Sequence, residues 1–222
     1  MKDRRPVRIF KKYIRVWALI YSCIYLLWFF LLEKHITTDY HIIHCSLDDR
    51  IPFNEYFIIP YLSWFIYLIP AVLYMSRGNA DEFCRYFLYL AAGTSICLFV
   101  CTVFPNGTGA DFRPVIDPHK NWACALVSLI YRSDTPTNVF PSIHVCTTIG
   151  THIAILRNRR FAEKPWIGKV SLAVAVLIIL STMFLKQHSV LDVVSGGLLS
   201  VLLYRLFYGN APAPKKTEAA GK

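Results

Sequence analysis

Charged side chains are scarce in this sequence: only 17% of its 222 residues are Asp, Glu, Lys or Arg, whereas 55% are hydrophobic. A soluble domain of this size needs more charge to cover its surface, so the composition excludes an ordinary soluble globule. The same hydrophobicity excludes an intrinsically disordered chain. The sequence therefore predicts a protein whose surface lies largely in a lipid bilayer.

Paired cysteine motifs are also missing. The seven cysteines form no CxxC pair and no zinc-binding spacing, and most of them lie within apolar runs. We interpret them as small buried hydrophobic residues, without a disulfide framework. Three histidines, His35, His41 and His44, cluster in one segment, but their spacing is weak support for a metal site. We predict neither a metal nor a cofactor.

Apolar runs are abundant, and six of them are long enough, or nearly so, to cross a bilayer as helices of about 20 residues. They are Val16–Leu32, Phe57–Met75, Tyr86–Phe104, Pro141–Leu156, Val170–Leu185 and Ser189–Tyr208. The fourth run is short and rich in threonine, so we expect it to face the protein interior. The predicted fold is all-α: a polytopic membrane protein with a bundle of six transmembrane helices.

Basic residues outnumber acidic ones by 24 to 14, which gives a formal net charge of +10. The predicted spans place 18 Lys and Arg residues on one side of the membrane and 6 on the other. The positive-inside rule therefore predicts cytoplasmic termini, and the charge indicates anionic lipid headgroups, with no nucleic-acid partner. We predict a basic cytoplasmic segment (1–15), a catalytic membrane domain (16–208) and a disordered cytoplasmic tail (209–222).

Ionisable residues near the spans concentrate on the predicted outer side, where they are candidates for function. His188 and Asp192 are four residues apart at the start of the sixth run, so they lie one turn apart on one helix face. A carboxylate there can fix the tautomer of the imidazole and leave its other nitrogen free as a nucleophile or base. A structural pair that braces two helices is the alternative.

The fourth run begins with Pro141, Ser142 and His144. The free N–H groups of such a first turn favour an anion, although an ordinary capped helix fits this pattern too. Arg113 lies in a glycine-containing loop and can hold a phosphate with two parallel N–H bonds. Lys186 is a second candidate cation, and both also fit interfacial side chains. Together these groups match the needs of metal-free phosphoryl transfer through a phosphohistidine.

This combination of motifs resembles the type 2 phosphatidic acid phosphatase superfamily of integral membrane enzymes. The Pro-Ser-x-His motif of that family fits residues 141–144, and its first motif keeps Arg113-Pro114. Its third motif keeps Ser181, His188 and Asp192 at the family spacing. The six-span layout is also similar, so the resemblance covers most of the chain.

Two phosphate-holding cations of the family are missing. The first-motif lysine falls at Asn106 and the third-motif arginine at Thr182. By position, Lys186 is the candidate to replace one of them. The variant pattern resembles the branch of inositol phosphorylceramide synthase-like proteins, in which an alcohol can replace water as the acceptor.

The resemblance implies that His188 attacks phosphorus, that Asp192 orients it, and that His144 protonates the leaving alcohol and then activates the acceptor. The implied phosphate-binding residues are Arg113, Ser142 and Lys186. The family requires no divalent metal and no cofactor.

Our first hypothesis is a metal-independent lipid phosphate phosphatase, a phosphoric monoester hydrolase at the extracytoplasmic face of a bacterial plasma membrane. Its expected substrate is a phospholipid or polyprenyl phosphate. The alternative is a lipid phosphotransferase, similar to sphingolipid or inositol phosphorylceramide synthases, that passes the phospho-headgroup to an alcohol. A third hypothesis is a transporter or scaffold that keeps this fold without the chemistry; the presence of His144, His188 and Asp192 counts against it.

Overall fold

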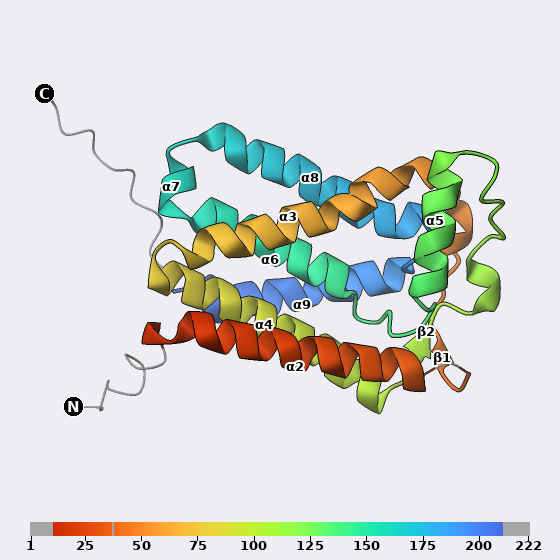
Figure 1. Ribbon diagram of the computed structural model, residues 1–222, viewed down its shortest axis with the longest axis horizontal. Coiled ribbons are helices and arrows are strands. Elements are labelled where there is room, and N and C mark those ends of the chain that lie inside the picture. Colours follow the sequence, from red (N-terminus) through yellow and green to blue (C-terminus); the bar gives the residue numbers. More distant parts are fainter. Residues whose placement is uncertain (1–10, 37, 211–222) are drawn as a thin grey trace, which may run out of the picture.

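The computed structural model of the protein describes residues 11–36 and 38–210, and these are mostly helical (Figure 1). The helices are α2 (Ile14–His35), α3 (Ile58–Ser76), α4 (Ala80–Val103), α5 (Trp122–Ser133), α6 (Ile143–Arg157), α7 (Arg159–Ala162), α8 (Pro165–Phe184) and α9 (Val190–Tyr208). The short strands β1 (His41–Ile42) and β2 (Asn106–Gly107) pair in parallel. The all-α prediction is therefore confirmed. Residues 1–10 and 211–222, which hold most of the predicted terminal segments, lie outside the described residues.

Five helices of the described chain are long and apolar enough to cross a membrane. They are Ile14–His35, Glu55–Ser76, Ala80–Val103, Pro165–Phe184 and Val190–Tyr208. They correspond to five of the six predicted spans, and the predicted fourth span is the 15-residue α6. Large hydrophobic side chains such as Leu19, Leu27 and Phe30 of α2 are exposed. Such a surface is stable when lipid covers it, so the chain is an integral membrane protein.

Helix α6 lies at the centre of the bundle and contacts α3, α4, α8 and α9. Two of its three threonines, Thr147 and Thr151, form hydrogen bonds inside the protein, in keeping with the predicted inward orientation of this helix, whereas the buried Thr148 hydroxyl has no partner among the described residues. Thr151 bonds the carbonyl of Thr147 at 2.7 Å and the hydroxyl of Tyr86 at 2.8 Å, and Trp64 donates to Thr147 Oγ1 at 3.1 Å. Shielded from lipid by its neighbours, α6 can carry polar groups that a lipid-facing helix could not.

The two ends of the bundle differ in structure (Figure 1). One end carries α5, β1, β2 and the turn 185–189 between α8 and α9. The other end carries the turn between α3 and α4 and the short α7, and α2 begins and α9 ends there. The outward-facing connections of the predicted topology therefore gather at one end, whereas the cytoplasmic location of the termini stays a prediction.

Close packing of α4 against α6 depends on a glycine. A Cβ atom at Gly150 would overlap the ring of Tyr89, which is fully buried, whereas a Cβ atom at Gly197 of α9 would meet nothing within 4 Å. Helix propensity favours Ala over Gly by about 1 kcal/mol in both helices. Only the overlap at Gly150 opposes that gain, at a cost of about 1–3 kcal/mol for an overpacked core.

We therefore expect Gly150→Ala to lower the melting temperature of the detergent-purified protein and Gly197→Ala to leave it unchanged or raise it. Scanning fluorimetry of both variants beside the parent protein measures the difference. A Gly150→Ala variant as stable as Gly197→Ala would contradict this account of the α4–α6 contact.

Candidate active site

A tight turn between α8 and α9 fixes the position of His188. The backbone N–H groups of Gln187 and His188 both donate to the carbonyl of Thr182, at 2.9 and 3.0 Å. Lys186 adopts the left-handed region with a φ of 52°, which reverses the chain direction. The side chain of His188 is therefore buried against the end of α8 instead of pointing into solvent.

Asp192 joins the start of α9 to the imidazole of His188. Its Oδ2 accepts the backbone N–H of Ser189 at 2.8 Å, as part of a capping box, and lies 3.3 Å from His188 Nδ1. The four-residue spacing in the sequence predicts this pair. Because the carboxylate can only accept a hydrogen bond, we assign the ring proton to Nδ1, which leaves Nε2 unprotonated. Burial, followed by the nearby charge of Arg113, lowers the pKa of His188 to about 3 and keeps the ring neutral.

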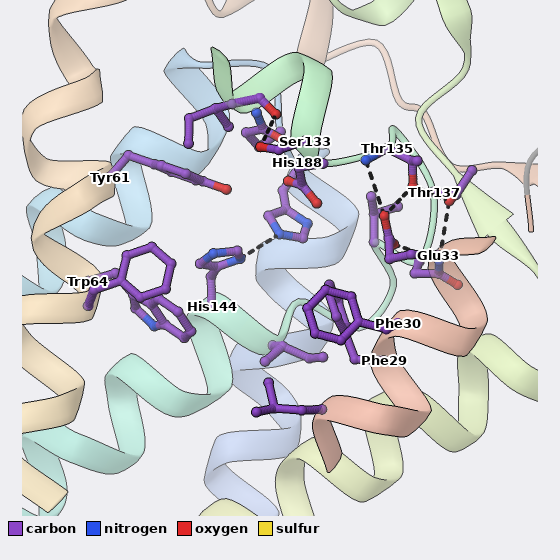
Figure 2. A pocket seen from close by; sticks show the side chains of 18 of the residues that line it. Phe29, Phe30, Glu33, Tyr61, Trp64, Ser133, Thr135, Thr137, His144 and His188 are labelled. Carbon is purple, nitrogen blue, oxygen red and sulfur yellow. Dashed lines mark hydrogen bonds between the residues drawn. The ribbon is translucent and has the colours of Figure 1, made fainter. Parts of the chain in front are cut away.

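His144 stands in the first turn of α6, and its Nδ1 lies 3.3 Å from His188 Nε2 (Figure 2). With Nε2 of His188 unprotonated, His144 Nδ1–H is the donor of this bond. The rings of Trp64 and Tyr61 from α3 lie beside His144, with centroids 4.7 and 5.2 Å away. The two imidazoles and Asp192 thus form one chain of three groups, brought together from α6 and α9.

Arg113 reaches the same place from the loop after β2. Its Nη1 donates to the carbonyl of Asp134 at 2.6 Å, and its Nη2 donates to the carbonyl of Thr135 and to Gln187 Oε1. Its guanidinium lies over the ring of Tyr131, 4.8 Å from the centroid. Burial raises the pKa of the Asp134 carboxyl to about 6, although the charge of Arg113 acts in the opposite direction.

The two imidazoles and Arg113 line a cavity of about 330 Å³ between α2, α3 and the segment that precedes α6, and Asp192 lies behind His188 without lining it. Figure 2 shows Tyr61 and Trp64 on one side of the two imidazoles, and Phe29, Phe30 and Glu33 on the other. The aromatic wall continues into a second cavity of about 260 Å³, since Tyr25, Trp64 and Ile143 line both. The cavity is therefore polar around the imidazoles and apolar towards the middle of the bundle, which suits an amphiphilic molecule.

Four of the six predicted site residues, Arg113, His144, His188 and Asp192, are brought together here. Ser142 is fully buried and caps α6, with its Oγ 3.3 Å from Val145 N. Lys186 donates from Nζ to the carbonyl of Asp48 at 2.7 Å. Neither Ser142 nor Lys186 lines the cavity, and their contacts with phosphate stay predictions.

Asn106 and Thr182, which stand where the family motifs have cations, form hydrogen bonds that stabilise the fold near the site. Asn106 is fully buried: its Oδ1 accepts the N–H groups of Val139 and Phe140, and its Nδ2 donates to the carbonyls of Phe104 and Phe140. Thr182 supplies the carbonyl on which the turn before His188 closes. The side-chain amide of Asn106 and the main-chain carbonyl of Thr182 hold the backbone that presents the imidazoles, and the Thr182 hydroxyl donates to the carbonyl of Ile179 within α8.

Asp48, Glu33 and Gln187 are site residues that the sequence analysis missed. Asp48 accepts hydrogen bonds from Ser189 Oγ at 2.6 Å, and from the N–H groups of Val190 and Cys45 at 2.8 Å each. Glu33 accepts from Asn138 Nδ2 and twice from Thr135. Apart from Cys45, their partners lie more than 100 residues away, so local spacing carried no signal for the role of Asp48 or Glu33 at this site. Gln187 carried one signal, its position beside His188.

One of three comparisons with known proteins found a match. Residues 84–214, more than half of the chain, match a family model described as the PAP2 superfamily. The match includes Arg113, His144, His188 and Asp192, and begins after α2 and α3. No curated protein and no solved structure matches the chain. No group of three or more His, Cys, Asp or Glu side chains suited to a metal ion was found within the described ranges.

Asp48 anchors the start of α9, and its substitution tests how this turn is held. Burial by itself raises the pKa of Asp48, but hydrogen bonds from Ser189, Val190 and Cys45 outweigh burial and lower it below its ordinary value. A lowered pKa contributes stability that is present above the ordinary pKa, about 4, and is lost as the pH falls through the folded-state pKa. Asp48→Asn should therefore lower the free energy of unfolding by about 1–3 kcal/mol at neutral pH. The new amide NH₂ group would face an N–H or O–H donor in place of a carboxylate oxygen that accepts from it.

The corresponding measurement is the melting temperature of the purified variant at about pH 7 and about pH 3. We expect a large decrease relative to the parent protein at neutral pH and a smaller one in acid. Asp49→Asn is the matched control, because Asp49 is exposed and pairs with His44 at the surface, a contact of small value. Equal effects of the two substitutions would disprove the anchoring role of Asp48.

Proposed function

Because the chain belongs to the PAP2 superfamily, whose members are phosphatases or phosphotransferases, we propose that it cleaves a phosphate ester of a membrane lipid through a phosphohistidine at His188. The observation that carries this proposal is the position of the His188 ring: its Nδ1 lies 3.3 Å from the Asp192 carboxylate, and its Nε2 faces His144 at 3.3 Å on the wall of an amphiphilic cavity. An oriented, neutral imidazole with a second imidazole beside it is a nucleophile with a proton donor.

In the first step, His188 Nε2 forms a bond to phosphorus while the bond from phosphorus to the lipid oxygen breaks. In this step His144 acts as an imidazolium, a form that the negative charge of the bound phosphate favours, and its Nδ1 proton passes to the departing lipid alcohol, which leaves a neutral ring. The Nδ1–H of His188 stays hydrogen-bonded to Asp192. The carboxylate of Asp192 stabilises the positive charge that develops on the phosphorylated ring. The hydrogen bond between the two imidazoles is thus exchanged for contacts with the substrate.

In the second step, water attacks the phosphorylated His188. His144, now a neutral ring, takes a proton from that water and becomes an imidazolium again, while phosphate leaves and Nε2 of His188 is free. The balance is one ester hydrolysed per cycle, with both histidines restored. Arg113 supplies positive charge to the phosphoryl oxygens, and it is preorganised because its fork is held by the carbonyls of Asp134 and Thr135. This route requires no metal ion.

Two observations bear on where the site lies in the membrane: its access from the bilayer and the predicted topology. The cavity is bounded by α2, whose apolar side chains are exposed, so a lipid can enter from the bilayer without leaving it. We propose that the site faces the extracytoplasmic side, since 18 of the 24 basic residues fall on the opposite side of the predicted topology. The candidate substrates remain a phosphatidate, a phosphatidylglycerophosphate or a polyprenyl diphosphate.

A phosphotransferase is the second candidate, and the carboxylate of Glu33 favours it. This group lines the cavity together with Thr135 and Thr137, opposite the aromatic side chains of α3. A carboxylate does not attract a phosphate, but it can accept a hydrogen bond from the hydroxyl of an alcohol. An alcohol bound there would compete with water for the phosphorylated His188.

The covalent route predicts the behaviour of two histidine variants. His188→Ala should reduce turnover by about 10⁴-fold or more, as expected when a nucleophile is lost. It should also retain no label from ³²P-lipid after a rapid acid-free quench, whereas the parent protein retains label at a histidine. His144→Ala should reduce turnover while still forming some labelled protein.

Orthovanadate should inhibit, and EDTA should leave the rate unchanged, because His188 and Arg113 perform the chemistry without a metal. Labelling of the His188→Ala variant at the parent level would exclude His188 as the nucleophile. Loss of all activity in EDTA would exclude the metal-free route.

The acceptor is tested by supplying radiolabelled donor lipid with and without ceramide or diacylglycerol and separating the products by chromatography. A hydrolase releases water-soluble phosphate in both cases. A transferase moves label into a new lipid, and Glu33→Gln should then reduce transfer more than hydrolysis. Label that stays out of new lipids under all conditions would exclude the transferase candidate.

A further inference from the structure

Two buried N–H donors at the site have no acceptor in the described part of the chain. They are Nε of Arg113 and Nε2 of Gln187. The side chain of Arg113 is 9% exposed and Gln187 is 3% exposed, so bulk water does not compensate them fully. A buried donor without an acceptor costs about 1–3 kcal/mol, so such a pair requires an explanation.

The amide of Gln187 can point in only one direction. A guanidinium has no acceptor, so the Gln187 atom that contacts Arg113 Nη2 must be the oxygen, Oε1. The amide nitrogen therefore points away from Arg113. Gln187 and Arg113 line the same cavity as the two imidazoles, and Gln187 precedes the proposed nucleophile His188 in the chain.

The cavity is poor in positive charge for an enzyme that binds phosphate. Arg113 is the only Lys or Arg side chain among the residues that line it, and Glu33 and Asp134 contribute carboxyl groups to the same wall. The two positions that carry cations in the family hold Asn106 and Thr182, both committed to backbone contacts. A dianionic phosphomonoester would leave uncompensated negative charge in this buried site, which is costly.

We propose that Gln187 and Arg113 together bind the non-bridging oxygens of a phosphodiester that carries a single negative charge. This inference rests on the proposed function and specifies its substrate class: a diester phospholipid in place of the monoester expected from the sequence. One arginine balances one negative charge. Gln187 donates a second hydrogen bond without adding charge. It therefore supplies the hydrogen bond that a missing cation would make, but not the positive charge.

The reaction on a diester keeps the same bonds. His188 Nε2 attacks phosphorus, the ester bond to the lipid alcohol breaks, and that alcohol takes its proton from His144. The other ester remains, so the headgroup stays attached to phosphorus on His188. Water or an alcohol then attacks phosphorus, transfers its proton to His144 and releases the headgroup phosphate or a new phosphodiester. No oxidant, reductant or metal is needed.

Gln187 could instead only brace Arg113, and two substitutions separate these roles. Gln187→Glu keeps an oxygen that accepts from Arg113 and has nearly the same shape, but it removes the Nε2 donor and adds charge. A bracing role predicts that this variant keeps its activity. A phosphate-binding role predicts a loss of about 100-fold in kcat/KM, the effect of removing one donor to reacting oxygens. Gln187→Met, which removes both contacts, should lose at least as much.

The experiment compares lipids with matched acyl chains in detergent micelles, with the purified full-length protein. The diesters are phosphatidylglycerol and phosphatidylethanolamine, and the monoester is phosphatidate. The parent protein should turn over at least one diester with a kcat/KM about tenfold or more above that of phosphatidate, and this turnover should vanish in His188→Ala. Asn79→Asp is the matched control, because Asn79 is exposed and caps α4 at the far end of the bundle, a role that Asp fills equally well.

The outcomes separate this inference from the proposed function. Turnover that requires His188 but prefers phosphatidate would overturn the inference and leave the proposed function standing. Full activity of Gln187→Glu on the preferred lipid, at an unchanged melting temperature, would also overturn it. If no lipid is turned over in a manner that requires His188, the proposed function fails, and the inference fails with it.

Discussion

The site depends on one carboxylate at the start of one helix. Asp192 binds the backbone N–H of Ser189 and the imidazole of His188 with the same oxygen, Oδ2. The beginning of α9 and the tautomer of His188 are therefore set by a single buried group. Asp48 adds a second set of contacts, because it accepts hydrogen bonds from Ser189 and Val190 and joins the connection between α2 and α3 to this turn. The same hydrogen bonds hold the start of α9 and orient the ring of His188, so a substitution that breaks them affects both.

The bilayer explains why the site lies where it does. A membrane protein can keep ionisable groups only where neighbouring helices exclude lipid, and the central α6 is such a place. α6 presents His144 at its first turn, while α2 and α3 close the cavity with aromatic side chains and leave their outer faces to lipid. The proposed substrate, with an apolar tail and a phosphate group, would contact the aromatic wall with its tail and the imidazoles with its phosphate.

The charge of the site departs from the motif pattern of the family, because Asn106 and Thr182 stand where that pattern has cations. Asn106 and Thr182 stabilise the loop and the turn that carry the histidines, and Arg113 is held by main-chain carbonyls and by Gln187. The framework for phosphoryl transfer is thus retained, whereas its electrostatics differ from those of a site built with three cations. On our proposal, a neutral amide in place of a charged side chain alters which phosphate esters bind and leaves the sequence of chemical steps unaffected.

The sequence by itself determined the all-α class, five long apolar helices, the polar character of the interior helix α6 and the local pairing of His188 with Asp192. These features depend on short-range periodicity and composition, which are visible along the chain. Tertiary structure alone decided that His144 meets His188, that Glu33 and Asp48 join the site, and that Lys186 and Ser142 lie off the cavity. Those outcomes depend on contacts between residues far apart in the chain and on the direction in which each side chain leaves its helix. No local pattern encodes either property, because both arise only when the helices pack.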